Sequence, residues 1–177
     1  LQPARAVDRG IAEGLELRAQ AAYGNGDFEA AVSAWEDLYS LLAGDGDDAG
    51  AARAAAMVAM YLMMDTGLMA PVRGWLRRAE RLLEGDVEAP ASAVIAMVRT
   101  YERFMCGDMA AARVQSALAI ELGTRLGVAP AVVIGRVAAA RVTIFDGHLD
   151  EGLELLDEMA VVLMSGEVDA LTTGMMY

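Results

Sequence analysis

Apolar and polar residues follow one another along most of the chain with the spacing of amphipathic α-helices. One stripe of large and small apolar side chains, three or four residues apart, consists of Phe28, Ala31, Trp35, Leu38 and Leu42. Strand-like alternation of β-branched residues is rare, so the pattern predicts an all-α fold with Trp35 in its core. The expected helices cover residues 7–23, 28–42, 49–66, 71–84, 90–104, 108–126, 130–145 and 150–164.

A short motif recurs between these helices at a nearly constant interval. Its glycines stand at positions 26, 67, 107 and 147. A period of about 40 residues is typical of a repeat array, in which each helical hairpin buries its apolar face against its neighbours. The four copies are Gly26-Asp27-Phe28-Glu29-Ala30-Ala31, Gly67-Leu68-Met69-Ala70-Pro71-Val72, Gly107-Asp108-Met109-Ala110-Ala111-Ala112 and Gly147-His148-Leu149-Asp150-Glu151-Gly152.

The residue types of the motif fit a turn between two helices. Glycine adopts the left-handed backbone that ends the first helix. Asp27 and Asp108 then occupy the N-cap position of the second helix, which aspartate favours. Ala31, Ala112 and Gly152 stand four residues after that position, and their small size allows two helices to approach closely.

The repeats define the expected domain organisation. We predict one α-solenoid domain of four helical hairpins, over residues 7–43, 49–85, 90–127 and 130–166, with the start of a fifth at 169–177. Because the fifth repeat is incomplete, we expect the chain to be a segment of a longer protein. The segment Gly44–Asp48 is predicted to be a loop.

Composition and charge narrow the classes of partner. The chain has 177 residues, is 56% hydrophobic, and carries a net charge of −12 with no lysine. An acidic chain is a poor ligand for nucleic acid or an anionic membrane, so we expect neither partner. The longest uncharged apolar run, from Ala54 to Met64, is too short to span a bilayer. A single cysteine, Cys106, excludes an internal disulfide and favours a cytoplasmic location.

The repeated Gly-Asp-aromatic turn followed by a small residue resembles the tetratricopeptide repeat family. In the first repeat, Gly26, Asp27, Phe28, Ala31 and Trp35 match the turn, aromatic, small and large positions of that family. The interval in this chain is longer than the usual 34, and the family's Trp-x-x-Leu-Gly signature is missing from the first helices. The resemblance implies a tetratricopeptide-like solenoid that binds a partner.

The arginine-rich phrase from Arg73 to Ala79, within repeats of about 40 residues, is similar to the helical segments of large actinobacterial LuxR-type transcriptional regulators and related multidomain signal proteins. That resemblance implies a non-catalytic protein-interaction or signal-sensing segment, which would bind a protein or peptide. The alternative is a receptor domain that encloses an apolar small molecule within the superhelix. We expect neither an enzyme nor a cofactor.

Counting back from each turn glycine gives matching positions on the first helices, which line the concave groove in tetratricopeptide arrays. Methionine, tyrosine and arginine are adaptable or favoured in binding hot spots, although the same positions would suit the core between repeats. One row consists of Met57, Met97 and Val137, a second of Tyr61, Tyr101 and Arg141, and a third of Met64, Phe104 and Ile144. The groove candidates are Met57, Tyr61, Met64, Met97, Tyr101, Phe104 and Arg141.

Other polar residues fit structural roles better than chemical ones. The acidic loop Asp45, Asp47 and Asp48 lacks the glutamate that an EF-hand requires at its twelfth position. The only histidine, His148, stands in a turn with no second ligand for a metal, so no metal site is expected. Cys106 is predicted to be a small buried side chain. The arginine stripe of the second repeat is predicted to be a solvated outer face, and it consists of Arg73, Arg77 and Arg81.

Overall fold

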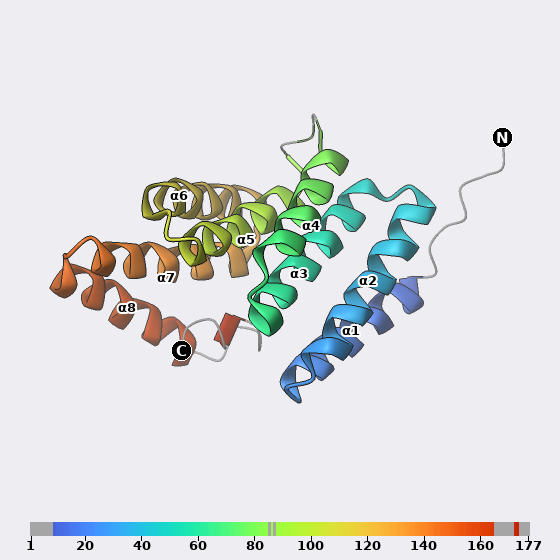
Figure 1. Ribbon diagram of the computed structural model, residues 1–177, viewed down its shortest axis with the longest axis horizontal. Helices are drawn as coiled ribbons and strands as arrows, with labels where there is room; N and C mark the ends of the chain where they lie inside the picture. The colour runs from blue at the N-terminus through green and yellow to red at the C-terminus, as the bar shows by residue number, and fades with distance from the viewer. Residues whose placement is uncertain (1–8, 85, 87, 165–171, 174–177) are drawn as a thin grey trace. The chain divides into compact units, whose positions relative to one another are not determined.

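The computed structural model describes residues 9–84, 86, 88–164 and 172–173, and within them every regular element is an α-helix (Figure 1). The fold is therefore an all-α helical repeat array, as the apolar periodicity predicts. Its helices are α1 (Arg9–Gly24), α2 (Phe28–Asp45), α3 (Asp48–Thr66), α4 (Met69–Leu82), α5 (Ala91–Met105), α6 (Met109–Leu126), α7 (Ala129–Phe145) and α8 (Leu149–Met164).

The predicted helix ends lie close to those of the structure, with one instructive exception. The segment Gly44–Asp48 is not a loop, because α2 continues to Asp45 and α3 begins at Asp48. Only Gly46 and Asp47 separate the two helices. The prediction was wrong here because a run of glycine and aspartate favours a loop on average. One glycine that ends α2 and one aspartate that caps α3 are sufficient to connect the two helices.

The turn glycines of the repeats are confirmed as left-handed. Gly26, Gly67, Gly107 and Gly147 have φ angles of 76°, 64°, 77° and 94°, and no non-glycine residue in the described part of the chain has a positive φ. A residue with a Cβ atom would be strained at this angle. The regular spacing of these glycines therefore records a backbone requirement that is repeated in each hairpin.

Aspartates cap three helices with nearly the same geometry. Asp27 and Asp108, both predicted as caps, accept hydrogen bonds from the backbone N–H of Ala30 at 3.0 Å and of Ala111 at 3.1 Å. Asp47 does the same for the N–H of Gly50 at 2.9 Å. Each bond satisfies one of the backbone donors that a helix N-terminus leaves without a partner.

The chain divides into two compact units, residues 1–91 and 92–177. In the first unit, α1 packs on α2, α2 on α3 and α3 on α4. Its largest buried side chains are those of Trp35, Leu38, Met60, Tyr61 and Leu76, so the predicted core position of Trp35 is confirmed. In the second unit, α6 packs on α7 and α7 on α8.

Glycines inside the helices of the second unit let the helix axes approach. A Cβ atom added to Gly152 of α8 would lie 2.9 Å from the Ala140 carbonyl oxygen of α7 and would also collide with Ile144. One added to Gly135 of α7 would lie 2.9 Å from Cγ1 of Ile120 in α6. The close approach predicted at Gly152 is therefore confirmed.

The predicted start of a fifth repeat at 169–177 lies outside the described residues, apart from the helical pair Thr172 and Thr173. Of the helices described, none combines the length and the apolar character that crossing a membrane requires.

Candidate binding site

The groove candidates divide into buried and half-buried side chains. Met57, Tyr61, Met97 and Tyr101 are buried, and Tyr61 is only 1% exposed. Met64, Phe104 and Arg141 are half-buried. The buried four belong to the core. The half-buried positions are those of the third row, which lies at the end of each first helix next to the turn, and Arg141 of the second row.

In the first unit, Tyr61 closes an aromatic cluster that joins three helices. Its ring lies 5.3 Å from that of Tyr23 in α1 and 6.2 Å from that of Trp35 in α2, measured between centroids. The Arg53 guanidinium lies 5.5 Å from the centroid of the Trp35 ring and pairs with Glu16 of α1 in a bidentate ion pair. These contacts fix α1, α2 and α3 to one another, which is a structural role for the first residue of the tyrosine row.

In the second unit, the same row forms a contact across one repeat. Arg141 Nη1 of α7 donates a hydrogen bond of 3.1 Å to the hydroxyl of Tyr101 in α5, and the guanidinium lies 6.0 Å from the centre of the Tyr101 ring. Burial raises the pKa of Tyr101 above its usual value of 10.0, and the nearby positive charge and hydrogen bond of Arg141 offset part of that rise. Tyr101 is therefore a neutral, hydrogen-bonded phenol at physiological pH.

Aromatic rings extend this contact to the surface of the second unit. Phe104 lies 6.4 Å from Tyr101 and 5.3 Å from Phe145, and the second pair packs edge to face. Phe145 is 67% exposed. Counting from the turn glycine selects its half-buried neighbour Ile144 instead, so sequence reasoning missed Phe145. The signal that identifies it is an aromatic residue at the last position of a helix, beside an exposed turn.

Together, Tyr101, Phe104, Arg141 and Phe145 form a continuous strip that we call the aromatic–arginine strip. Its inner end is a buried phenol and its outer end is an exposed ring. Arg141 contributes a half-buried cation. Rings and guanidinium groups in this kind of setting supply a large contact area and directed hydrogen bonds to a partner.

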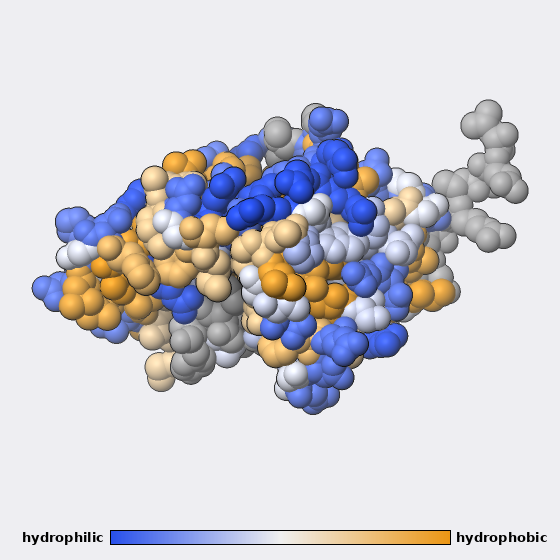
Figure 2. Space-filling model, viewed as in Figure 1, coloured by the Kyte–Doolittle hydropathy of each residue, from blue (hydrophilic) through white to orange (hydrophobic). Residues whose placement is uncertain are grey.

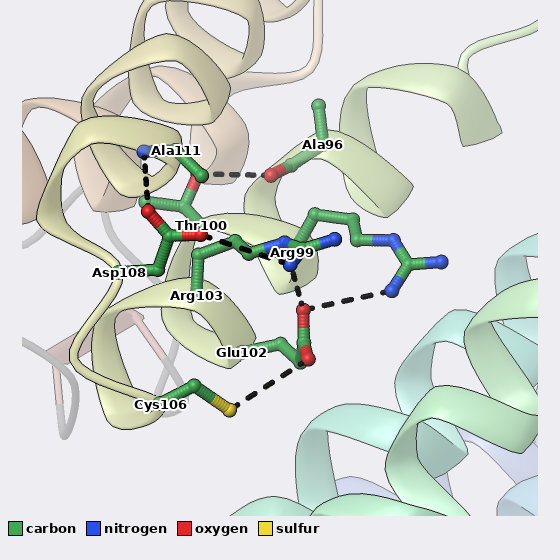
Figure 3. Close-up of polar contacts among 8 residues, drawn as sticks. All are labelled: Ala96, Arg99, Thr100, Glu102, Arg103, Cys106, Asp108 and Ala111. Carbon is green, nitrogen blue, oxygen red and sulfur yellow. Dashed lines mark hydrogen bonds and ion pairs between the residues drawn. The ribbon is translucent and has the colours of Figure 1, made fainter.

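A buried carboxylate lies one residue from this strip and points into a polar cluster (Figure 3). Glu102 is fully buried, with Oε2 at 3.3 Å from Nε of Arg103 and at 3.6 Å from Nη1 of Arg99. Arg103 also lies 3.9 Å from Asp108, the cap of α6. Two arginines thus neutralise the buried charge, and the network connects the end of α5 to the start of α6.

The polar cluster corrects the expectation for Cys106. Its side chain is exposed rather than buried, and Sγ lies 3.8 Å from Oε1 of Glu102. Residue 106 belongs to the turn that follows α5, where the chain leaves the core. Neither the burial of Glu102 nor the exposure of Cys106 follows from residue type.

The arginine stripe of α4 is confirmed as an exposed face, and Figure 2 shows strongly hydrophilic surface gathered over that helix. Arg78 lies over the rings of Trp75 and Tyr39, at 4.6 Å and 5.5 Å from their centres. An open hollow on this face is lined by Gly74, Arg77, Glu80, Arg81 and Glu84. Its charged rim differs from the apolar lining typical of small-molecule sites.

The remaining chemical candidates have structural positions. His148 is exposed in the turn before α8, as predicted. Asp47 of the acidic segment is occupied as a helix cap. Within residues 9–84, 86, 88–164 and 172–173, no group of three or more histidine, cysteine or acidic side chains could hold a metal ion.

No protein-family model matches the sequence, and no curated protein matches it.

Proposed function

We propose that this chain is a non-catalytic protein-interaction or signal-sensing segment of a larger cytoplasmic bacterial regulator. The repeat architecture supports this proposal, because stacked hairpins present matching side chains from successive helices to one partner. The resemblance of its repeats to tetratricopeptide arrays and to the helical segments of LuxR-type regulators adds the regulatory context.

The observation that carries the proposal is the aromatic–arginine strip of the second unit. The four residues of the strip come from α5 and α7. Each contacts the next in the order Arg141, Tyr101, Phe104 and Phe145. In a binding hot spot, a rigid side chain is exposed to the partner and is held in place by well-packed neighbours. The exposed Phe145 ring and the buried Tyr101 end of the strip have this arrangement. A peptide that places an apolar side chain against Phe145 and a carboxylate or carbonyl against Arg141 would use the whole strip.

The polar cluster supports a non-catalytic role for the neighbouring residues. The Glu102 carboxylate is engaged by Arg99 and Arg103. Both arginines lie against Oε2 of this buried carboxylate, whereas a general acid must be able to reach a reacting group and donate a proton to it. We therefore assign Glu102 the task of holding the end of α5.

The test is selection from a displayed peptide library on the whole chain, followed by calorimetry with the enriched peptides. We expect their dissociation constants to rise by about tenfold or more in Arg141→Ala and Phe145→Ser, the loss typical of a hot-spot residue. Two exposed positions away from the strip, Arg136 and Leu17, provide the matched controls Arg136→Ala and Leu17→Ser.

Failure to enrich any peptide, or equal binding to all four variants, would contradict the proposal. Tight binding of an apolar dye in place of peptides would favour the alternative, a receptor for an apolar small molecule. The regulatory assignment has its own test in the full-length protein, which should carry a DNA-binding or signalling domain.

A further inference from the structure

Helix α4 concentrates positive charge on a chain that is acidic as a whole. It contains four of the 14 basic residues of the chain and a single acidic one. All four arginines are exposed, and Figure 2 shows strongly hydrophilic surface over this helix. These arginines are Arg73, Arg77, Arg78 and Arg81. On a chain with a net charge of −12, such a face is a local feature that can attract an anion.

The middle of α4 has a gap between the arginine side chains. Gly74 is followed by an arginine three, four and seven residues later, so the four positions share one helix face. A Cβ atom added to Gly74 would have nothing within 4 Å. The open hollow on this face has a volume of about 550 Å³ and is lined by Gly74, Arg77, Glu80, Arg81 and Glu84. A ligand can therefore reach the helix surface at Gly74 with arginines beside it.

The three arginines that follow Gly74 keep their hydrogen-bond donors for a ligand. Within the part of the chain that the structure describes, the side chains of Arg77 and Arg81 form no hydrogen bond and no ion pair. The Arg78 guanidinium is positioned by the rings of Trp75 and Tyr39, and ring contacts of this kind use no hydrogen-bond donor. Guanidinium groups bind phosphates and carboxylates through paired hydrogen bonds.

This face of a second helix stays exposed when the next helix packs. The equivalent positions, counted by the repeat period, are residues 33, 36, 37 and 40 of α2 and residues 114, 117, 118 and 121 of α6, and all are exposed. Nevertheless, α3 packs on α2 and α7 packs on α6. The arginine-bearing face of α4 is therefore not the face that a following helix covers.

The positive charge is confined to one helix of the first unit, which limits the size of the anion. In α2 the equivalents of Arg77 and Arg78 are the acidic residues Glu36 and Asp37. Glu80 and Glu84 line the hollow itself. An extended polyanion such as nucleic acid needs cations along its length and would meet these carboxylates. A compact dianion needs only the arginines around Gly74.

The surroundings favour a phosphate that is carried on a peptide over a free phosphate ion. The hollow is open and larger than one phosphate group. The rings of Trp75 and Tyr39 are half-buried and lie beside Arg78. A peptide can pack on such rings, and a free ion cannot make these contacts.

We propose that the face formed by Gly74, Arg77, Arg78 and Arg81, which we call the α4 arginine face, binds a phosphoserine or phosphothreonine of a partner protein. The phosphate would lie over Gly74 and accept hydrogen bonds from Arg77 and Arg81. Glu80 and Glu84 would favour neutral or basic residues next to the phosphorylated one. Arginine clusters recognise phosphorylated segments by this chemistry. The site uses no residue of the aromatic–arginine strip, so it goes beyond the proposed function.

The probe is a random peptide library with a fixed central phosphoserine, which is selected on the whole chain. An enriched peptide is then measured by fluorescence anisotropy in its phosphoserine, serine and glutamate forms. We expect the phosphoserine form to bind at least about tenfold more tightly than the other two, because a phosphate supplies more charge and more acceptors. Its affinity should fall as salt rises, and inorganic phosphate should compete only weakly.

The arginines are tested by two double variants that change the net charge equally. Arg77→Ala/Arg81→Ala should weaken binding of the phosphoserine peptide at least about tenfold. The control Arg125→Ala/Arg136→Ala removes two exposed arginines of the second unit and should bind like the original chain.

The gap is tested without a change of charge. Gly74→Gln places a neutral side chain in the hollow and should also weaken the phosphoserine peptide at least about tenfold. Its control is Gly14→Gln, at an exposed glycine of α1 where an added Cβ atom likewise has nothing within 4 Å. All these variants change exposed positions, and circular dichroism melts verify that they fold.

Each other outcome overturns the inference. Equal binding of the serine and phosphoserine forms, or equal weakening by Arg125→Ala/Arg136→Ala, would mean that no phosphate is recognised at this face. Inorganic phosphate that competes as strongly as the peptide would indicate a site for a free anion. Binding of single-stranded DNA or phosphatidylserine vesicles in place of the phosphopeptide would assign the face to a polyanion. A phosphopeptide that senses Arg141→Ala and none of the α4 variants would bind at the strip, so the proposed function would stand while this inference fails.

Discussion

Arg141 donates a hydrogen bond to the hydroxyl of Tyr101, a residue that stands at the equivalent point of the preceding repeat. The contact joins α5 to α7, so two residues that stand one repeat apart in the sequence touch each other in the structure. Tyr101 is only 5% exposed, which makes Arg141 the polar partner of a buried hydroxyl.

We predict that Arg141→Ala destabilises the chain by about 1–3 kcal/mol, because it leaves the buried Tyr101 hydroxyl without this donor. Tyr101→Phe removes the hydroxyl as well, and the double variant should lose less than the sum of the two single changes. Urea unfolding of the four proteins measures the difference. Strictly additive losses would show that the two side chains do not interact.

Tyr101 also gives the chain a pH dependence at alkaline pH. Burial raises its pKa in the folded state above 10.0, so the unfolded chain releases this proton at a lower pH than the folded chain. The contribution of Tyr101 to stability should therefore be constant well below pH 10 and should fall as the pH rises from there through the folded-state pKa. Thermal melts across this range should show a smaller loss for Tyr101→Phe, since the variant has no phenol to titrate at this position.

Gly152 and Gly74 should respond in opposite directions to alanine. At Gly152 a Cβ atom would collide with Ile144 and lie 2.9 Å from a carbonyl oxygen, so Gly152→Ala should cost about 1–3 kcal/mol. At Gly74, inside α4, nothing lies within 4 Å of the added atom. Gly74→Ala should stabilise the chain by about 0.5–1 kcal/mol, because alanine is the better helix former. Chemical unfolding of both variants compares them directly.

Asp47 and Asp48 are neighbours with the same charge and different roles. Asp47 caps α3 through the Gly50 N–H, whereas Asp48 is the first residue of the helix itself. Asp47→Ala should cost about 0.5–2 kcal/mol, the usual loss for a missing cap. Asp48→Ala should cost less, since only a charge near the helix dipole is removed. A larger loss for Asp48→Ala in thermal melts would contradict this assignment.

Much of the fold can be predicted from sequence because the repeats rely on local chemistry. A glycine with positive φ at position 26 or 107, followed by a capping aspartate, determines where one helix ends and the next begins. Trp35 could be placed in the core because its neighbours in the stripe are apolar. These signals depend on a few adjacent residues and need no tertiary information.

The surface of the candidate site could not be predicted in the same way. Tyr61 and Tyr101 stand at equivalent positions to Arg141 and yet are buried, because the depth of a side chain depends on the helices packed around it. Glu102 is one of 26 acidic residues, and its complete burial beside Arg99 and Arg103 is apparent only from the structure. Phe145 was identified as part of the site only from its ring contact with Phe104 in the structure.

The turns at Gly26–Asp27 and Gly107–Asp108 have an implication for protein engineering. Their backbone angles are nearly the same: the glycine φ angles are 76° and 77°, and the aspartate φ and ψ angles are −90° and 79° in one, −87° and 75° in the other. We therefore expect that either turn can replace the other. A chimaera that carries residues 26–31 in place of 107–112 should keep its helix boundaries, so loops and side chains could be transplanted between hairpins without redesigning the backbone that supports them.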